Sequence, residues 1–256
     1  MGVRELFELN GKIALVTGGS RGLGLQIAKG LAEMGAKIAI SARKAAELEQ
    51  ARTELKGLGV DALTVVNDLS KEGQPAALVD AVNAHYGRID ILVNNAGASW
   101  GAAAEQHPLE AWNKVMALNA TSVFALSQAV ANRCFIPRRA GVIIVVASTA
   151  ALRVGMAMKA VAYYSSKAAV LHLTRALATE WGRYNIRVNA ICPGFFPSRM
   201  ASGFLETAAP ELIAATPLGR LGNDTDLQGA AVYLASEASR HVTGQYIAVD
   251  GGASAA

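Results

Sequence analysis

The chain alternates between short apolar runs and longer segments of mixed polarity. Each short run is rich in Val and Ile and is mostly followed by Gly, Asn, Asp or Ser, a pattern typical of strands that are buried on both faces of a sheet. We predict strands at residues 13–16, 37–40, 62–66, 89–93, 142–146, 186–191 and 246–249.

The segments between these runs have the length and the Ala, Leu, Glu and Lys content of helices. We predict helices at residues 23–34, 45–58, 74–86, 109–133, 161–183 and 226–235. Strands that alternate with helices form right-handed crossovers, which build a parallel sheet with helices on both faces. The sequence therefore predicts an α/β fold, in which a doubly wound, Rossmann-like sheet forms a single domain over residues 1–256.

One stretch departs from this alternation. Residues 193–217 contain four prolines and three phenylalanines, and we expect them to be irregular. Long loops in compact domains are mostly functional. We therefore expect residues 195–217 to form a lid over a substrate site.

The composition fits a large buried core. Apolar residues make up 52% of the chain and charged residues 17%, against a usual charged share of about 25%, which excludes a disordered protein. Lys and Arg exceed Asp and Glu by only 24 to 20 and are spread along the chain, so we expect no nucleic-acid partner. No apolar run is long enough to span a membrane and residues 1–12 lack a signal-peptide pattern, so we expect a cytoplasmic protein with no membrane partner.

Cysteine and histidine chemistry is not expected. Cys134 and Cys192 are too few for a disulfide framework, and the four histidines have no metal-ligand spacing, so we expect no metal. Cys192 follows a predicted strand near the other candidate residues. We interpret it as a small buried residue rather than a nucleophile.

A glycine-rich turn follows the first predicted strand and runs Thr17-Gly18-Gly19-Ser20-Arg21-Gly22-Leu23-Gly24. Glycines permit a tight turn and let the backbone approach a pyrophosphate, while the next helix offers its N–H groups and positive dipole. The spacing differs from G-x-G-x-x-G, so the prediction depends on the position of the turn at the first strand–helix junction. We predict a nucleotide phosphate site here.

The second predicted strand ends at Ala42 and Arg43, where NAD-binding proteins place a carboxylate on the ribose 2′-hydroxyl. Arg21 already stands in the glycine turn. Two guanidinium groups can pair with a 2′-phosphate through charge-assisted hydrogen bonds. We expect NADP(H) to be preferred, with NAD(H) as the alternative.

Four further positions carry candidate chemistry. Tyr163 and Lys167 are four residues apart and share one helix face; a nearby ammonium favours the phenolate, so we expect Lys167 to lower the pKa of Tyr163. Ser148 follows the fifth strand, at the edge of the sheet where ligands bind. Asn119 lies within a predicted helix, where Asn is a mediocre helix former.

These motifs resemble the single-domain, NAD(P)-dependent branch of the short-chain dehydrogenase/reductase family, in family order over almost the whole chain. The matching residues are 17–24, Asp68-Leu69, Asn94-Asn95-Ala96-Gly97, Asn119, Ser148, Tyr163, Lys167, Pro193-Gly194 and Asp250-Gly251-Gly252. The resemblance implies a seven-stranded sheet of order 3-2-1-4-5-6-7 and a homotetramer or homodimer.

The resemblance also implies roles for single residues. Asn119, Ser148, Tyr163 and Lys167 would be catalytic, with Asn119 holding a water that links Lys167 to solvent. Asp68 and Leu69 would flank the adenine. The expected cofactor-binding residues are Gly18, Ser20, Arg21, Gly22, Leu23, Gly24, Arg43, Asp68, Leu69, Asn95, Ala96, Gly97, Tyr163, Lys167, Pro193, Gly194, Phe196 and Ser198.

The substrate is a small carbonyl compound or alcohol in this interpretation. Ser99-Trp100-Gly101 and Phe195-Phe196-Pro197-Ser198-Arg199-Met200 are similar to β-ketoacyl reductases associated with rhamnolipid synthesis. This favours the reversible reduction of a 3-oxoacyl thioester to a secondary alcohol. A sugar acid, a polyol or an aryl ketone is the alternative, as is a non-catalytic nucleotide-sensing protein on the same fold.

Overall fold

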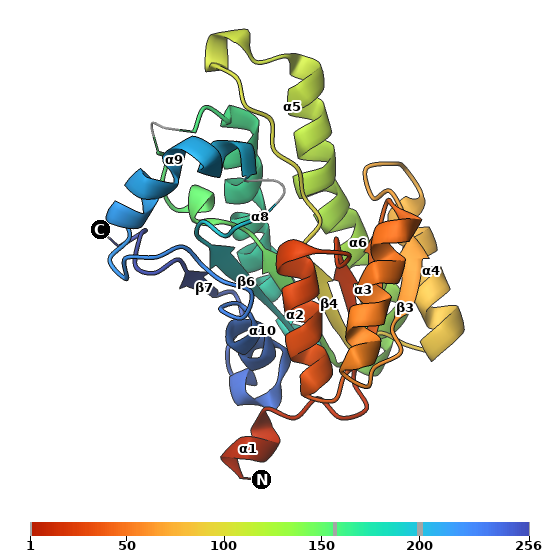
Figure 1. The fold of residues 1–256 in the computed structure, drawn as a ribbon. Coiled ribbons are helices and arrows are strands. Elements are labelled where there is room, and N and C mark those ends of the chain that lie inside the picture. Colours follow the sequence, from red (N-terminus) through yellow and green to blue (C-terminus); the bar gives the residue numbers. More distant parts are fainter. Residues whose placement is uncertain (1, 156–157, 199–201, 256) are drawn as a thin grey trace.

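The computed structural model describes residues 2–155, 158–198 and 202–255. Within these residues a parallel seven-stranded sheet has the order β3-β2-β1-β4-β5-β6-β7 (Figure 1). Every predicted strand is present, and the expected strand order is confirmed. The strands are β1 (Ile13–Thr17), β2 (Lys37–Ala42), β3 (Leu63–Val66), β4 (Ile91–Asn94), β5 (Gly141–Val146), β6 (Ile186–Pro193) and β7 (Tyr246–Val249).

Helices cover both faces of the sheet. One face is covered by α2 (Gly22–Glu33), α3 (Ala45–Gly57) and α10 (Gln228–Ala235). The other face is covered by α4 (Gln74–Tyr86), α6 (Ser122–Val130) and α8 (Val161–Trp181). The short elements are α1 (Val3–Leu6) and the 3-10 turns η1 (Ala104–Gln106), η4 (Thr149–Ala151), η5 (Gly182–Tyr184) and η6 (Glu237–Ser239).

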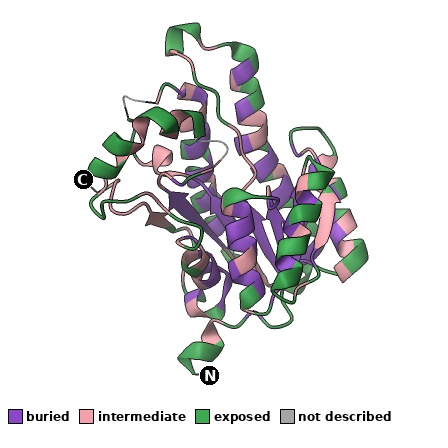
Figure 2. Ribbon diagram, viewed as in Figure 1, coloured by how far each residue is buried: buried purple, intermediate pink, exposed green. Residues whose placement is uncertain are grey.

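The strand core explains why the apolar runs are continuous. Successive side chains of a strand point to opposite faces, so Leu15 packs under α4, α6 and α8 while Val16 packs under α2, α3 and α10. Both side chains are fully buried, and the middle of the sheet is buried throughout (Figure 2). All strands are parallel, so their carboxyl ends meet along one edge.

The predicted helix at 109–133 is not one regular helix. It divides into α5 (Leu109–Met116), a π-helical turn η2 (Ala117–Thr121), α6, a second π-helical turn η3 (Ala131–Phe135) and α7 (Ile136–Arg138). A π-helical turn takes one extra residue, which re-aims the side chains in it, and such turns are frequent at functional sites. Asn119 lies in η2 and is buried there.

The expectation that residues 193–217 are irregular is wrong in part, because Ser202–Ala214 forms the helix α9. Leu205, Ala208 and Leu212 are strong helix formers, and their preference outweighs the one backbone hydrogen bond that Pro210 removes. Arg199 and Met200 lie outside the described residues.

Three chemical features follow from the described part of the chain. No helix in it is long and apolar enough to cross a membrane, and no three His, Cys, Asp or Glu side chains in it form a metal-binding group. Cys192 is a buried free thiol. Burial raises its pKa to about 11, so the thiol is protonated at neutral pH, as a structural residue requires.

Candidate active site

Two cavities lie at the carboxyl edge of the sheet and share Tyr163 as a wall. The first cavity has a volume of about 490 Å³ and extends from the glycine turn to Lys167. The second has a volume of about 720 Å³ and is bounded by Ser148 and by residues of α9. Both volumes are in the range of small-molecule sites.

The glycine turn is held in place by the segment that follows β4. The side-chain amide of Asn95 donates to the carbonyl oxygens of Thr17 at 2.8 Å and Gly18 at 3.2 Å. In return, the Thr17 hydroxyl oxygen accepts from the N–H groups of Asn95 at 2.9 Å and Ala96 at 3.0 Å. Gly18 has φ +62°, a left-handed conformation that favours glycine. Turn and strand end therefore form one rigid wall of the first cavity.

Gly24 is the position in this wall with the least space. A Cβ atom there would lie 2.4 Å from the Asn95 amide nitrogen and closer still to the carbonyl oxygen of Gly18. We expect Gly24→Ala to push Asn95 off the turn, to destabilise the protein by about 1–3 kcal/mol, and to weaken nucleotide binding. Thermal unfolding and a nucleotide titration measure the two effects.

Gly57 provides the matched control for Gly24. It is also a helical glycine, and a Cβ atom there would meet no atom within 4 Å. Gly57→Ala should leave both stability and binding unchanged or slightly improved. Equal behaviour of the two variants would contradict the proposed role of the close contact at Gly24.

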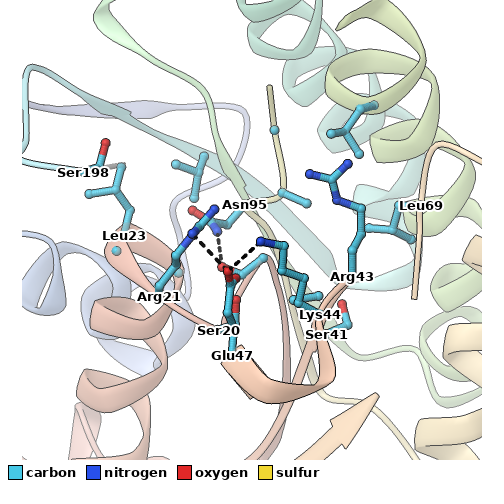
Figure 3. A pocket seen from close by; sticks show the side chains of 18 of the residues that line it. Ser20, Arg21, Leu23, Ser41, Arg43, Lys44, Glu47, Leu69, Asn95 and Ser198 are labelled. Carbon is cyan, nitrogen blue, oxygen red and sulfur yellow. Dashed lines mark hydrogen bonds and ion pairs between the residues drawn. The ribbon is translucent and has the colours of Figure 1, made fainter. Parts of the chain in front are cut away.

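Basic side chains gather at the end of the first cavity beside β2. Arg21, Arg43 and Lys44 all line it, and Figure 3 shows Arg21 and Lys44 converging on the carboxylate of Glu47. Asp68 lies nearby; the Ser70 hydroxyl, which donates to it at 2.7 Å, lowers its pKa, and Arg43 adds a smaller lowering. This end of the cavity suits an anionic group on a nucleoside.

The pKa of Tyr163 differs from the expectation. Its pKa is raised above the ordinary value, because burial disfavours the phenolate more than the hydrogen bond from Ser148 favours it. The Lys167 ammonium lies 5.6 Å from the centre of the Tyr163 ring and donates to the carbonyl oxygen of Val146 at 2.8 Å. The net shift of the Tyr163 pKa is therefore upward, and the predicted lowering is wrong, because burial has the larger effect. Tyr163 is a protonated phenol at neutral pH.

Lys167 is a buried cation. Its side chain is enclosed between β5 and α8, and burial lowers its pKa from 10.5 to about 8. The folded protein therefore releases this proton near pH 8, whereas the unfolded chain retains it up to about pH 10.5. Between these values the unfolded state binds more protons, so the stability contributed by this group rises with pH.

This linkage predicts a pH-dependent difference between the wild type and Lys167→Met. As the pH rises from about 8 to 10.5, the wild type should gain about 3 kcal/mol of unfolding free energy relative to the variant, at about 1.4 kcal/mol per pH unit. Urea unfolding of both proteins across this interval measures the difference. A difference that does not change with pH would show that Lys167 titrates normally in the folded state.

Asn119 links two segments of the chain through the hydrogen bonds of its side chain. Its amide exchanges hydrogen bonds with the backbone N–H and carbonyl of Ala98, both at 2.8 Å, and donates to the Ser166 hydroxyl at 3.0 Å. That hydroxyl in turn donates to the carbonyl oxygen of Tyr163 at 2.8 Å. Asn119 thus ties the segment after β4 to the start of α8. Its expected role in holding a water stays a prediction.

Ser148 begins the turn η4 at the end of β5. Its hydroxyl oxygen accepts from the Ala150 N–H at 3.1 Å, and its side chain is hydrogen-bonded to Tyr163. The serine lines the second cavity. A carbonyl oxygen placed between Ser148 and Tyr163 would therefore meet two hydroxyl groups.

Most of the predicted cofactor residues are brought together in one place. The first cavity is lined by Gly18, Ser20, Arg21, Gly22, Leu23, Gly24, Arg43, Asp68, Leu69, Asn95, Ala96, Gly97, Tyr163, Lys167 and Ser198. Gly194 and Phe196 line the second cavity instead. Pro193 lines neither of these cavities among the described residues, because it forms the end of β6 inside the sheet.

Sequence reasoning missed several lining residues. In the first cavity these are Ser41, Lys44, Glu47, Asn67, Leu118 and Asp224. Lys44 and Glu47 come one and four residues after Arg43, so charge patterning at the start of helix 45–58 could have found them. The second cavity is also lined by Arg153 and Lys159, in the loop 153–160 that the resemblance to the family places beside the substrate.

The fold and the site define an oxidoreductase architecture, in which a nucleotide-binding sheet edge adjoins a Ser–Tyr–Lys group. A family model described as enoyl-(acyl carrier protein) reductase matches residues 18–254. The chain belongs to the short-chain dehydrogenase/reductase family.

Individual relatives differ in their reported substrates. Gluconate 5-dehydrogenase of Gluconobacter oxydans is 40% identical over 97% of this chain and 96% of its own. A 3-oxoacyl-(acyl-carrier-protein) reductase of rhamnolipid biosynthesis in Pseudomonas aeruginosa is 42% identical over 96% and 97%. The crystal structure of a gluconate 5-dehydrogenase from Burkholderia cenocepacia, in complex with NADP and tartrate, has a TM-score of 0.94 at 36% identity and covers all of both chains.

Proposed function

We propose that this chain is an NADP(H)-dependent oxidoreductase that reversibly reduces a ketone to a secondary alcohol. The observation that carries the proposal is the position of Tyr163 on the wall between the two cavities, hydrogen-bonded to Ser148 and beside Lys167. A proton donor placed there adjoins both a nucleotide and a second ligand.

The first cavity fits NADP(H) in shape and charge. The glycine turn can offer backbone N–H groups to the pyrophosphate, Asp68 and Leu69 line the cavity and would flank the adenine, and Arg21, Arg43 and Lys44 would pair with a 2′-phosphate. The Burkholderia relative that binds NADP supports this choice. Lys167 and Tyr163 are the residues that would hold the nicotinamide ribose at the other end.

NADP(H), when bound, supplies or accepts the hydride. The protein handles the proton and the charge on oxygen. Tyr163 is protonated at neutral pH because burial raises its pKa, so it can donate its proton to the carbonyl oxygen as a general acid. Ser148 donates a hydrogen bond to the same oxygen and stabilises its developing negative charge. The cationic Lys167 favours the tyrosinate that remains after the proton transfer.

We infer a 3-oxoacyl thioester as the substrate. The second cavity is mostly apolar, with Phe195, Phe204 and Leu212 among its walls, and the rings of Phe195 and Phe204 stack with centres 5.6 Å apart. These side chains come from residues 195–217, which we propose cover an acyl chain. The Pseudomonas relative, a 3-oxoacyl reductase, supports this class.

A sugar acid is the second candidate, because two cations line the same cavity. Arg153 and Lys159 both line it, and each carries a positive charge. A carboxylate would be attracted there. The Gluconobacter relative is a gluconate 5-dehydrogenase.

The test measures the consumption of NADPH and NADH by the purified protein with a short 3-oxoacyl thioester and with a 5-keto sugar acid. We expect rapid loss of NADPH with the thioester, slower loss with the sugar acid, and little loss of NADH. Turnover with the sugar acid alone would replace the thioester with the second candidate. No turnover with either substrate, although NADPH binds, would contradict both substrate classes.

A further inference from the structure

Glu47 is a carboxylate placed among the basic side chains of the first cavity. It lies in the first turn of α3, and its Oε1 atom is 3.3 Å from Nη1 of Arg21 and 3.3 Å from Nζ of Lys44 (Figure 3). The Glu47 side chain is 25% exposed, while Arg21 and Lys44 are 49% and 58% exposed. The carboxylate is thus the more enclosed partner, and both cations reach toward it from the cavity wall.

The same two cations are available to a 2′-phosphate. A phosphate monoester carries about −1.5 to −2 charges at neutral pH, and the two cations that it would pair with already contact Glu47. A phosphate that enters must therefore share their positive charge with the carboxylate and remain close to another anion. Without a phosphate, Glu47 pairs with both cations and offsets one of their two positive charges.

We propose that Glu47 is a specificity-determining residue, the internal counter-ion of the 2′-phosphate site, which weakens NADP(H) binding and so narrows the preference for NADP(H) over NAD(H). This inference depends on the proposed function, because it requires that NADP(H) binds in the first cavity. NAD(H) has no 2′-phosphate, so it leaves the pairs between Glu47 and the two cations intact. Arg43 remains available to a phosphate in addition, which keeps the preference on the side of NADP(H).

The direct test is the affinity of Glu47→Gln for NADPH and for NADH, measured by titration calorimetry. Removing the competing charge should tighten NADPH binding about 3- to 10-fold, since exposed ion pairs each contribute up to about 1 kcal/mol and two are involved. NADH binding should change less than about 2-fold. Glu47→Ala should behave like Glu47→Gln, with tighter NADPH binding and little change in NADH binding. Circular dichroism tests whether each variant is folded.

Glu49→Gln is the matched control. Glu49 lies on the same helix, is 66% exposed and pairs with Arg52 at 3.8 Å, and it does not line the first cavity. This variant removes the same charge two residues away, so it reports any general effect of net charge. Its NADPH affinity should equal that of the wild type.

Salt provides a second readout that a purely structural role of Glu47 would not change. The gain in NADPH affinity of Glu47→Gln should shrink as ionic strength rises, because these partly exposed charges are screened over about 10 Å at 0.1 M salt. Unchanged or weaker NADPH binding by Glu47→Gln would overturn the inference, because Glu47 would then only orient Arg21 and Lys44. If the wild type binds neither NADPH nor NADH, the proposed function fails instead.

Discussion

Replacing Tyr163 with Phe is expected to lower kcat/KM for carbonyl reduction about 10²- to 10⁴-fold, the usual contribution of a positioned general acid. The phenylalanine retains the ring beside Lys167 but loses the hydroxyl that is hydrogen-bonded to Ser148. The measurement is the initial rate of NADPH consumption over a range of substrate concentrations, which gives kcat/KM, together with a calorimetric titration of NADPH.

The titration separates chemistry from binding in this variant. NADPH affinity should stay within about 5-fold of the wild type, because a single neutral hydrogen bond contributes about 1 kcal/mol. Tyr184→Phe, which changes a tyrosine packed against Arg183 outside both cavities, should retain full activity. Turnover by Tyr163→Phe close to the wild-type rate would refute the assignment of Tyr163 as the proton donor.

The second large effect is expected for cofactor affinity. The double variant Arg21→Ala/Arg43→Ala should bind NADPH about 100-fold more weakly, at about tenfold for each arginine, because hydrogen bonds to charged groups contribute about 1.5 kcal/mol or more each. NADH lacks the 2′-phosphate, so its affinity should change far less. Titration with both nucleotides gives the ratio of NADPH affinity to NADH affinity, which shows whether the arginines select for the 2′-phosphate.

Arg52 offers the control for this variant. It is an exposed arginine of α3 that pairs with Asp61 at 3.0 Å and lies outside the first cavity. Arg52→Ala removes one positive charge from the same side of the molecule and should leave both affinities unchanged. An equal loss of NADPH and NADH affinity in the double variant would show that the arginines do not select for the phosphate.

Much of the fold follows from local patterns in the sequence. The strands are recognisable because each is a Val- and Ile-rich run buried on both faces, as Leu15 and Val16 illustrate. The π-helical turn at Asn119 is not recognisable in this way, because the Asn119 side chain bonds to the backbone of Ala98 and the hydroxyl of Ser166, which are distant in sequence. The helix α9 is not expected from the sequence, because the prolines of 193–217 indicate irregular structure, although Pro210 is accommodated within the helix.

The candidate site is likewise predictable from the sequence only where local patterns determine it. Residue types at strand ends predict the glycine turn and Ser148, and the four-residue spacing on one helix face predicts Tyr163 and Lys167. Burial decided the rest: the raised pKa of Tyr163 and the lowered pKa of Lys167 both arise from desolvation in the folded chain, which spacing along a helix does not reveal. The pairing of Glu47 with Arg21 likewise joins two helices, α3 and the start of α2.

The most direct test of the central claim follows the hydride itself. The protein is incubated with a short 3-oxoacyl thioester and NADPH that carries deuterium at both positions of the reactive nicotinamide carbon, and the alcohol product is analysed by mass spectrometry. We predict a single deuterium on the former carbonyl carbon, and no such product from Tyr163→Phe within the same time. An alcohol formed without deuterium, or equal labelling by Tyr163→Phe, would contradict the account.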